Sequence, residues 1–269
     1  MKRILKELEL LLLLFGFNGS KFINLILKFP AYVRGYLVLK TQLKVDKEFS
    51  FGRFSPILNE MDAESGIMKG NYFHQDILVA RKIFENKPLK HIDIGSRIDG
   101  FVAHVSIFRE IEIFDIRPQK NLVKNVKFTQ ADLTRLPKNM EACCDSISSL
   151  HAIEHFGLGR YGDPIDVDGH LKALNTIYSM LSENGTFYFS VPIGKQRIEF
   201  NEQRVFSVAY LLRLLESRYT IKTFSYVDDN GNLVEDAELT EEGISSNFNC
   251  NYYGCGIFEL IKLRKNTCK

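Results

Sequence analysis

Tryptophan is absent from the 269 residues, and no uninterrupted apolar run has the length that crosses a membrane. A spanning helix needs about 20 apolar residues, whereas the run at residues 10–17 has only eight positions. Glu7 and Glu9 stand directly before that run, and no small-x-small cleavage site follows it, so the segment matches a secretory signal peptide poorly. We therefore expect neither a spanning helix nor the aromatic belts of an integral membrane protein.

Cysteine is scarce, with five residues in the chain, two of them adjacent, and no C-x-x-C spacing. This usage excludes a disulfide framework and is typical of a reducing compartment. The formal net charge of +2 is nearly neutral, and we expect no nucleic-acid partner. We predict a cytoplasmic protein, with the inner face of a membrane as the alternative location. The sequence leaves the oligomeric state open.

The positive charge gathers at the amino terminus. Residues 1–50 hold nine Lys/Arg against four Asp/Glu, whereas residues 51–269 hold 26 against 29. Within 1–45, apolar side chains alternate with basic ones, which fits a segment that lies weakly on an anionic membrane surface. The alternative is a pair of helices that pack on the main domain or on a second subunit, and we favour it because apolar stripes usually belong to a core. We divide the chain into a basic, apolar helical extension (1–50) and a main domain (51–269).

Strand and helix patterns alternate from residue 71 onward. Short apolar strands are predicted at 89–95, 111–116, 125–130, 144–150, 186–191, 219–227 and 255–263, and amphipathic helices at 71–87, 170–181 and 207–217. Gly185 is the expected left-handed cap of the second helix, and the polar segment 228–254 has loop composition. The pattern predicts an α/β, Rossmann-like open sheet of seven mostly parallel strands with an antiparallel edge hairpin.

The turn after the first predicted strand contains a single glycine. Gly95 allows a tight turn beside a ligand, and Asp93 could accept hydrogen bonds from an amine. Arg97 and Asp99 occupy the positions of the other two glycines of a dinucleotide-binding fingerprint. Taken alone, the turn fits an ordinary strand-to-helix connection as well as a ligand site.

Acidic side chains also end the second and third predicted strands. Asp115 stands 20 residues after Gly95, where a carboxylate can accept both hydroxyls of a ribose, or can simply open a turn. Asp132 and Leu133 suit the edge and face of an adenine, although Asp132 is equally a preferred N-cap residue.

The segment after the fourth predicted strand is the richest in polar side chains. His151, Glu154 and His155 spell H-x-x-E-H, but a zinc-protease helix is not expected directly after a strand. Gly157, Gly159 and Gly162 spell G-x-G-x-x-G in the wrong place for a dinucleotide fingerprint, which favours a flexible loop. We predict no metal. The alternative is a divalent cation held by some of Asp163, Asp166, Asp168 and His170.

Several ordered stretches resemble class I S-adenosylmethionine-dependent methyltransferases: HIDIGSR, FDIRP, ADLTRLP, DSISSLHAIEHFG and LSENGTFYFSVP. A longer pattern over roughly residues 55–262, from YFHQD to CGIFE, is similar to the domain of unknown function family 268. The resemblance implies a methyltransferase-like fold and S-adenosylmethionine as cofactor. It implies that Asp93, Gly95, Ser96 and Arg97 line the methionine end, that Asp115 holds the ribose, that Asp132 and Leu133 border the adenine, and that His151 lies near the sulfonium.

Methyl transfer requires mainly that the acceptor be positioned and lose its proton. His155 or His151 is the expected base, with Glu154 orienting one of them and Asp163 as the next candidate. The acceptor is expected to be a small hydroxylated molecule, such as a glycan of a surface-polysaccharide pathway. Its predicted contacts are Asp163, Lys195, Arg197, Glu199, Asn201 and Arg204. Two alternatives stay open, namely a degenerate fold that binds nucleotide or glycan without turnover and a metal-dependent hydrolase.

Overall fold

The computed structural model describes residues 12–13, 15–16, 18–43, 48–58, 60–121, 123–252 and 254–264. Its contacts divide the chain into two compact units, one ending at Ile67 and one beginning at Met68. This division falls later than the boundary at residue 50 that the composition suggests.

The first unit contains one long helix, α2 (Gly19–Gln42). Asn18 caps its first turn by accepting a hydrogen bond from the backbone of Lys21, and Pro30 lies within it. Residues Lys21–Gln42, with a mean hydropathy of 1.3, are long and apolar enough to cross a membrane by length and composition. The predicted pair of helices falls partly outside the described residues; within them, residues 19–42 form one continuous 24-residue helix and residues 12–13 are also helical.

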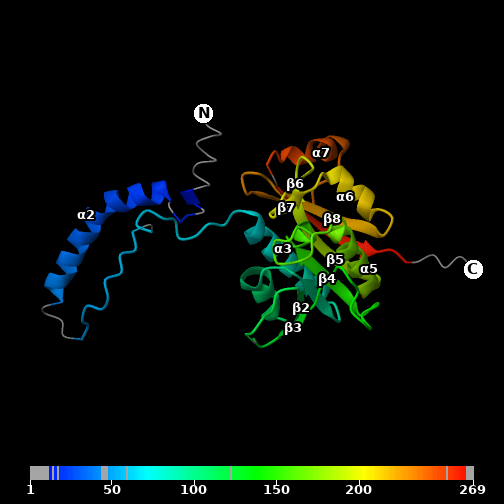
Figure 1. Cartoon of the computed structure of the whole chain (residues 1–269), viewed down its shortest axis with the longest axis horizontal. Helices are drawn as coiled ribbons and strands as arrows, with labels where there is room; N and C mark the ends of the chain where they lie inside the picture. The colour runs from blue at the N-terminus through cyan, green and yellow to red at the C-terminus, as the bar shows by residue number, and fades with distance from the viewer. Residues whose placement is uncertain are drawn as a thin grey trace, which may run out of the picture. The chain divides into compact units, whose positions relative to one another are not determined.

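The second unit is built on one sheet in the order β3-β2-β1-β4-β5-β10-β8-β9 (Figure 1). Its strands are β1 (His91–Ile94), β2 (Ile111–Asp115), β3 (Val126–Gln130), β4 (Cys144–Leu150), β5 (Leu181–Ile193), β8 (Tyr219–Val227), β9 (Leu233–Val234) and β10 (Gly254–Lys262). Neighbouring strands from β3 to β5 pair in parallel, whereas β10 is antiparallel to both β5 and β8. The mostly parallel sheet with an antiparallel edge confirms the predicted fold class.

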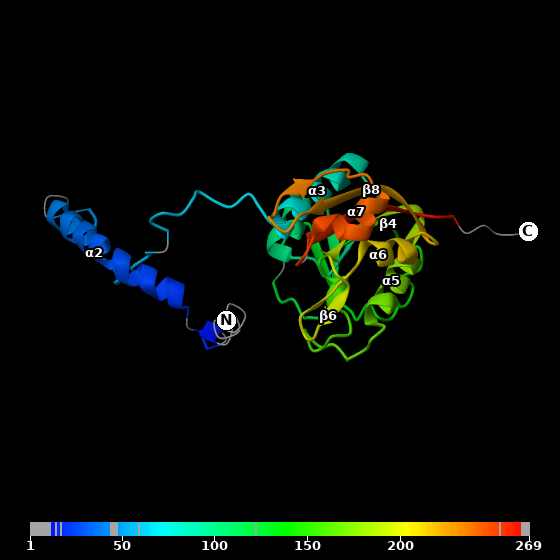
Figure 2. The ribbon, with the colours of Figure 1, turned by 90° about the horizontal axis from the view of Figure 1, so that it is seen from above.

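Helices cover both faces of this sheet (Figure 2). They are α3 (Asn71–Asn86), a π-helical turn (Ile98–Val102) leading into α4 (Ala103–Ser106), α5 (Gly169–Met180), α6 (Val208–Leu215) and α7 (Glu241–Ser246). Alternate residues of β5 serve the two cores, because Phe187 packs with α5 and α6 and Tyr188 packs with α3. The strands are thus supported by a hydrophobic core on each face of the sheet.

Some local predictions are wrong. The sheet has eight strands, because the short β9 pairs with the end of β8 inside the predicted loop, which also contains α7. The predicted antiparallel hairpin of β8 and β10 is present, with β10 on its inner side next to β5. Asn184, with φ +59°, and not Gly185, takes the left-handed conformation after α5. A two-stranded hairpin, β6 (Arg197–Glu199) and β7 (Gln203–Val205), fills the segment expected to hold the acceptor.

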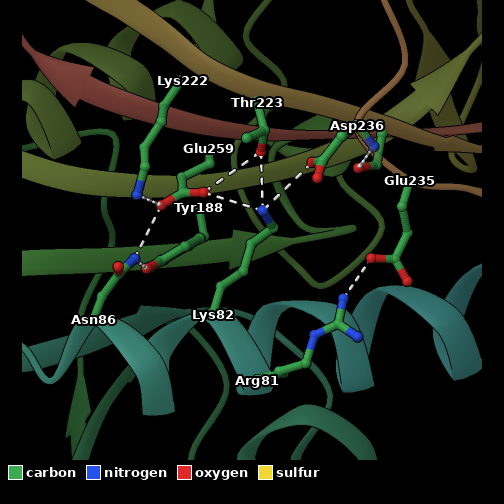
Figure 3. Close-up of polar contacts among 10 residues, drawn as sticks. Arg81, Lys82, Asn86, Tyr188, Lys222, Thr223, Glu235, Asp236 and Glu259 are labelled. Carbon is green, nitrogen blue, oxygen red and sulfur yellow. Dashed lines mark hydrogen bonds and ion pairs between the residues drawn. The ribbon is translucent and has the colours of Figure 1, made fainter.

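A buried carboxylate ties α3 to the sheet (Figure 3). Glu259 of β10 receives hydrogen bonds from Lys222 at 2.8 Å, Asn86 at 2.9 Å and Lys82 at 3.2 Å. Asn86 also donates to the hydroxyl of Tyr188 at 2.6 Å. Burial alone would raise the pKa of Glu259, but these donors outweigh it and hold the pKa below its ordinary value. Lys82 and Asn86 therefore fix α3 on the sheet through one acceptor.

Candidate functional site

Two cavities of about 450 and 380 Å³ open at the carboxyl ends of β1, β2 and β4, where open α/β sheets bind ligands. Both volumes lie in the range of small-molecule sites. The cavities share six lining residues, Gly95, Asp115, Arg117, His151, His155 and Tyr161, and are therefore parts of one cleft. The first cavity continues past β3 to Asp132 and Leu133, and the second continues to Ser96, Arg97 and Tyr72.

The turn after β1 is built from inside the sheet. Asp93 is fully buried, and its Oδ1 accepts hydrogen bonds from the hydroxyls of Ser96 and Ser148, each at 2.6 Å. Burial raises the pKa of Asp93 to about 6, although these hydrogen bonds oppose the rise. Gly95 has φ +69°, and a Cβ there would lie 3.0 Å from that of Ala152. Asp93 thus holds the turn and lines neither cavity, while Gly95 and Ser96 face the cleft.

Arg97 stands at the rim of the second cavity. Its Nε and NH2 donate to the two carboxylate oxygens of Asp99 at 3.1 and 2.9 Å, and its guanidinium lies 4.8 Å from the ring centre of Tyr72. Tyr72 comes from the first turn of α3, and its ring centre is 5.2 Å from that of His151. Sequence analysis missed Tyr72 as a site residue, although it belongs to the YFHQD stretch of the family resemblance.

Asp115, the last residue of β2, lines both cavities but is already engaged by a neighbour. Its Oδ1 accepts the backbone N–H of Arg117 at 2.8 Å and the Nε at 3.0 Å, and its Oδ2 accepts NH2 at 2.6 Å. The same guanidinium lies 4.3 Å from the ring centre of Tyr161. Neither Arg117 nor Tyr161 was a predicted site residue.

Asp132 and Leu133 line the first cavity after β3, as the methyltransferase resemblance implies for an adenine site. Asp132 Oδ1 accepts hydrogen bonds from the backbone N–H and the hydroxyl of Thr134 at 2.9 and 2.7 Å. This carboxylate therefore stabilises its own turn, while the buried Leu133 supplies an apolar wall together with Phe114.

The structure brings His151, Glu154 and His155 together directly after β4. His151 has φ +50°, a conformation that L-residues rarely adopt, and its Nδ1 lies 3.0 Å from Glu154 Oε1. A 3-10 turn (Ile153–His155) then places His155 Nε2 at 3.6 Å from the same oxygen. Glu154 is fully buried behind the two imidazoles, both of which line the cleft.

The surroundings of the two histidines shift their pKa values in opposite directions. His155 Nδ1 lies 2.6 Å from the carbonyl oxygen of Glu202, which can only accept, so Nδ1 carries the proton and Nε2 is the basic nitrogen. Burial lowers the pKa of His155, although Glu154 acts against this. Burial alone would also lower the pKa of His151, but Cys255 and Glu154 outweigh it and raise the pKa well above its ordinary value. The pKa values of the two imidazoles are thus displaced in opposite directions, which favours His155 as the base.

The glycine-rich segment after His155 is ordered by one carboxylate. Asp163 accepts the backbone N–H groups of Gly157, Tyr161 and Gly159 at 2.8, 3.2 and 3.3 Å. Gly157 has φ +78°, and a Cβ there would lie 2.0 Å from the carbonyl oxygen of Asp166. The glycines thus serve a hydrogen-bonded loop, and Asp163 lines the first cavity while holding that loop.

The hairpin β6–β7 contributes to the site through its backbone. Buried Arg204 donates to the carbonyl oxygens of Phe156 and Val167 at 2.6 and 3.2 Å, which fastens the loop after β4. Glu202 offers the carbonyl that orients His155. Five residues of this segment were predicted to contact the methyl acceptor, namely Lys195, Arg197, Glu199, Asn201 and Arg204. None of the five lines either cavity. Arg197, for example, pairs with Glu199 at 2.9 Å within the hairpin.

Three of the four side chains considered for a divalent cation, those of Asp163, Asp166 and His170, have other partners. Asp166 pairs with Lys172, and His170 Nε2 lies 3.2 Å from the hydroxyl of Tyr210. Among the residues that the structure describes, no group of three or more His, Cys, Asp or Glu side chains could hold a metal ion.

The sheet order, with one reversed strand between β5 and β8, and a cleft at the ends of β1, β2 and β4 define a methyltransferase-like α/β protein. A family model matches residues 110–251, more than half of the chain, and the chain belongs to that family, described as Caenorhabditis protein of unknown function, DUF268. A search of the curated proteins finds no match.

Solved structures of methyltransferases share the fold. The Burkholderia thailandensis 1,6-didemethyltoxoflavin-N1-methyltransferase, solved with 1,6-didemethyltoxoflavin and S-adenosylhomocysteine, is 14% identical with a TM-score of 0.51, over 71% of this chain and 79% of that one. A Galdieria sulphuraria protein provisionally identified as a sarcosine dimethylglycine methyltransferase is 14% identical with a TM-score of 0.50, over 71% and 86% of the two chains. At this identity the likeness concerns the fold, and the methyl acceptor is not identified.

Proposed function

We propose that this protein is an S-adenosylmethionine-dependent methyltransferase that acts on a hydroxyl of a small polar acceptor. The observation that carries the proposal is that one cleft is lined both by Asp115, at the end of β2, and by His155, whose basic nitrogen is defined by its hydrogen bond to Glu202. A carboxylate that can hold a ribose and a neutral imidazole that can take a proton are the two groups that the reaction needs.

The cleft fits the proposed cofactor in two parts. The first cavity combines the apolar Phe114 and Leu133 with Asp115, which suits an adenosine. The second cavity offers Gly95, Ser96 and Arg97 to the amino-acid end, with Arg97 as the cation for its carboxylate. S-adenosylmethionine would supply a methyl group activated by a sulfonium cation.

Within this cleft the chain would orient the acceptor and remove its proton. His155 Nδ1 is held by the Glu202 carbonyl, so Nε2 is presented as the acceptor of a hydroxyl proton. Glu154 Oε1, 3.6 Å from that nitrogen, would stabilise the imidazolium that forms. His151 is paired with the same carboxylate at 3.0 Å, which favours an electrostatic and positioning role for it.

The second cavity supports a polar acceptor, with a glycan as the proposed example. Three arginines line it, Arg97, Arg117 and Arg160, together with the rings of Tyr72 and Tyr161. Arg160 donates to the Glu202 carbonyl at 3.1 Å, and its guanidinium lies 5.5 Å from the ring centre of Tyr161. Arginine and tyrosine side chains bind hydroxyl, carboxylate and phosphate groups. They take the place that the sequence prediction gave to the β6–β7 segment.

A binding protein without turnover is the second candidate. Asp115 is engaged by Arg117, and Arg97 and Asp99 replace two glycines of the usual turn, which would weaken cofactor binding. The two candidates differ in whether methyl transfer occurs and depends on His155, because a binding protein needs no base at this position.

The test has two stages. Calorimetry of the full-length protein with S-adenosylhomocysteine should show binding, and incubation with methyl-labelled S-adenosylmethionine and a panel of neutral and acidic sugars should label an acceptor. His155→Gln should abolish labelling and leave S-adenosylhomocysteine binding intact, with His104→Gln, an exposed histidine outside both cavities, as the matched control. Absence of S-adenosylhomocysteine binding would refute the proposal, and equal labelling by His155→Gln would remove His155 as the base.

A further inference from the structure

The helix α2 has a composition that no helix of the second unit shares. Its 24 residues include no Asp or Glu and four basic side chains, Lys21, Lys28, Arg34 and Lys40. No part of its most apolar window is buried. A helix that exposes apolar and basic side chains without acidic ones is complementary to a surface that is both apolar and anionic.

One side of α2 already has partners within the first unit. Lys28 pairs with Asp62 at 2.7 Å, the ring of Tyr32 meets that of Phe54 edge-on at 5.7 Å, and Tyr36 contacts Phe51 at 4.8 Å. The three α2 residues are spaced four apart and therefore follow one side of the helix. The segment that follows α2 in the chain therefore contacts the middle of this side.

The opposite side exposes large apolar residues. Ile23, Ile26, Leu27 and Leu37 have exposed fractions of 59, 57, 70 and 56%. Their spacings of three, four and fourteen residues from Ile23 place them on one side of the helix, about 180° from Tyr32. These four residues are called the apolar face below.

Arg34 decides between the possible occupants of this face. It follows Leu27 by one heptad, so it projects from the same side, and among the described residues its side chain has no ion pair or hydrogen bond. A second copy of α2 would bring no carboxylate to Arg34, because the helix has none. Lipid phosphates would supply the anion, and the long arginine side chain can reach them while its neighbours enter the acyl region.

We propose that α2 lies along the surface of an anionic lipid membrane, with the apolar face in the outer acyl region and Arg34 and Lys40 at the phosphates. A spanning orientation is disfavoured because it would carry Lys28 and Arg34 into the hydrocarbon, where charged side chains are rare and costly. The inference is independent of the proposed enzymatic function.

The test is sedimentation of the full-length protein with vesicles. Phosphatidylcholine vesicles containing phosphatidylglycerol should bind it, pure phosphatidylcholine vesicles should bind it roughly tenfold less, and added salt should release it. The double variant Leu27→Asn/Leu37→Asn and the single variant Arg34→Glu should each lower binding roughly tenfold or more. Ile57→Asn is the matched control, because Ile57 is an equally exposed apolar residue of the same unit outside α2.

Four outcomes would overturn the proposal. Equal binding to both vesicle types would show that anionic lipid is not recognised, and resistance to alkaline carbonate extraction would show a spanning helix. A concentration-dependent dimer in analytical ultracentrifugation that Leu27→Asn/Leu37→Asn dissociates would assign the face to a second copy. A lower melting temperature of this double variant, relative to Ile57→Asn, would assign the face to packing within the chain.

Discussion

Removing Arg117 should tighten the binding of S-adenosylhomocysteine, whereas removing Asp115 should weaken it. A carboxylate offers about four acceptor positions, and the backbone N–H, Nε and NH2 of Arg117 fill three of those of Asp115. A ribose diol needs two, so at least one contact with Arg117 must break when the ligand binds. The proposed cofactor site thus includes a group of the chain itself, the Arg117 side chain, that competes with the ribose for Asp115.

The geometry sets the size of both effects. Arg117 is half exposed, with a side-chain exposed fraction of 48%, so its pairing with Asp115 stabilises the free protein by about 1 kcal/mol or less. Arg117→Met should therefore raise the affinity by up to about fivefold. Asp115→Ala removes hydrogen bonds to a charged group and should cost about 1.5–3 kcal/mol, or roughly 10- to 150-fold.

Isothermal titration calorimetry with S-adenosylhomocysteine measures both effects, and Arg213→Met, which removes an exposed arginine on α6, serves as the matched control. When Asp115 is already replaced by Ala, adding Arg117→Met should not change the affinity further, because the gain in affinity from Arg117→Met depends on the freed Asp115 carboxylate. If Arg117→Met weakens binding as much as Asp115→Ala does, the guanidinium contacts the ligand directly and Asp115 only positions it. That result would refute the competition argument.

Three further predictions concern catalysis and stability. His155→Gln should lower turnover by about 10²–10⁴-fold with little change in cofactor affinity. Because burial lowers the pKa of His155, the wild-type rate should stay constant as the pH is lowered, until the pH falls below the ordinary histidine range. A wild-type rate that already falls at pH 7 would contradict this. Glu259→Gln should lower the free energy of unfolding in urea by about 2 kcal/mol, since Lys82 and Lys222 lose their buried acceptor; an unchanged midpoint would show that the cluster contributes nothing. Burial lowers the pKa of His91 to about 3, so the native state binds fewer protons than the unfolded state below pH 6.5. The stability advantage of the wild type over His91→Gln should therefore shrink by about 2 kcal/mol between pH 7 and pH 5. Parallel curves of stability against pH for the two proteins would refute the assignment.

The strand pattern was predictable because the central strands are buried on both faces and form short apolar runs. β4 and β8 begin and end where the apolar runs do, and β10 differs from its prediction by one residue. β5 begins five residues before its predicted start, because pairing of Leu181 with Cys144 extends it, and such pairing leaves no trace in composition. Edge elements such as β9, with two residues, lie below the length at which periodicity can be recognised.

The site was predictable where it depends on position at a strand end. Asp115 and His155 line the cleft because the carboxyl ends of parallel strands meet at one edge, which follows from the alternation of strands and helices. Tyr72 and Arg160 could not be assigned in this way, because their places depend on how α3 and the loop after β4 fold back on the sheet. Arg204 was predicted to contact the methyl acceptor because it is charged, but its guanidinium donates to the backbone carbonyl oxygens of Phe156 and Val167.

The polar residues around the cleft fall into two groups that differ in what their atoms contact. Asp163 accepts hydrogen bonds from backbone N–H groups and Arg204 donates to backbone carbonyl groups, and both stabilise the loop after β4. Among the described residues, the buried side-chain atoms without a hydrogen-bond partner include His151 Nε2 and Glu154 Oε2. Buried polar atoms are almost always satisfied, so the orphaned nitrogen of His151, a residue that lines the cleft, favours a ligand or an ordered water as the missing partner.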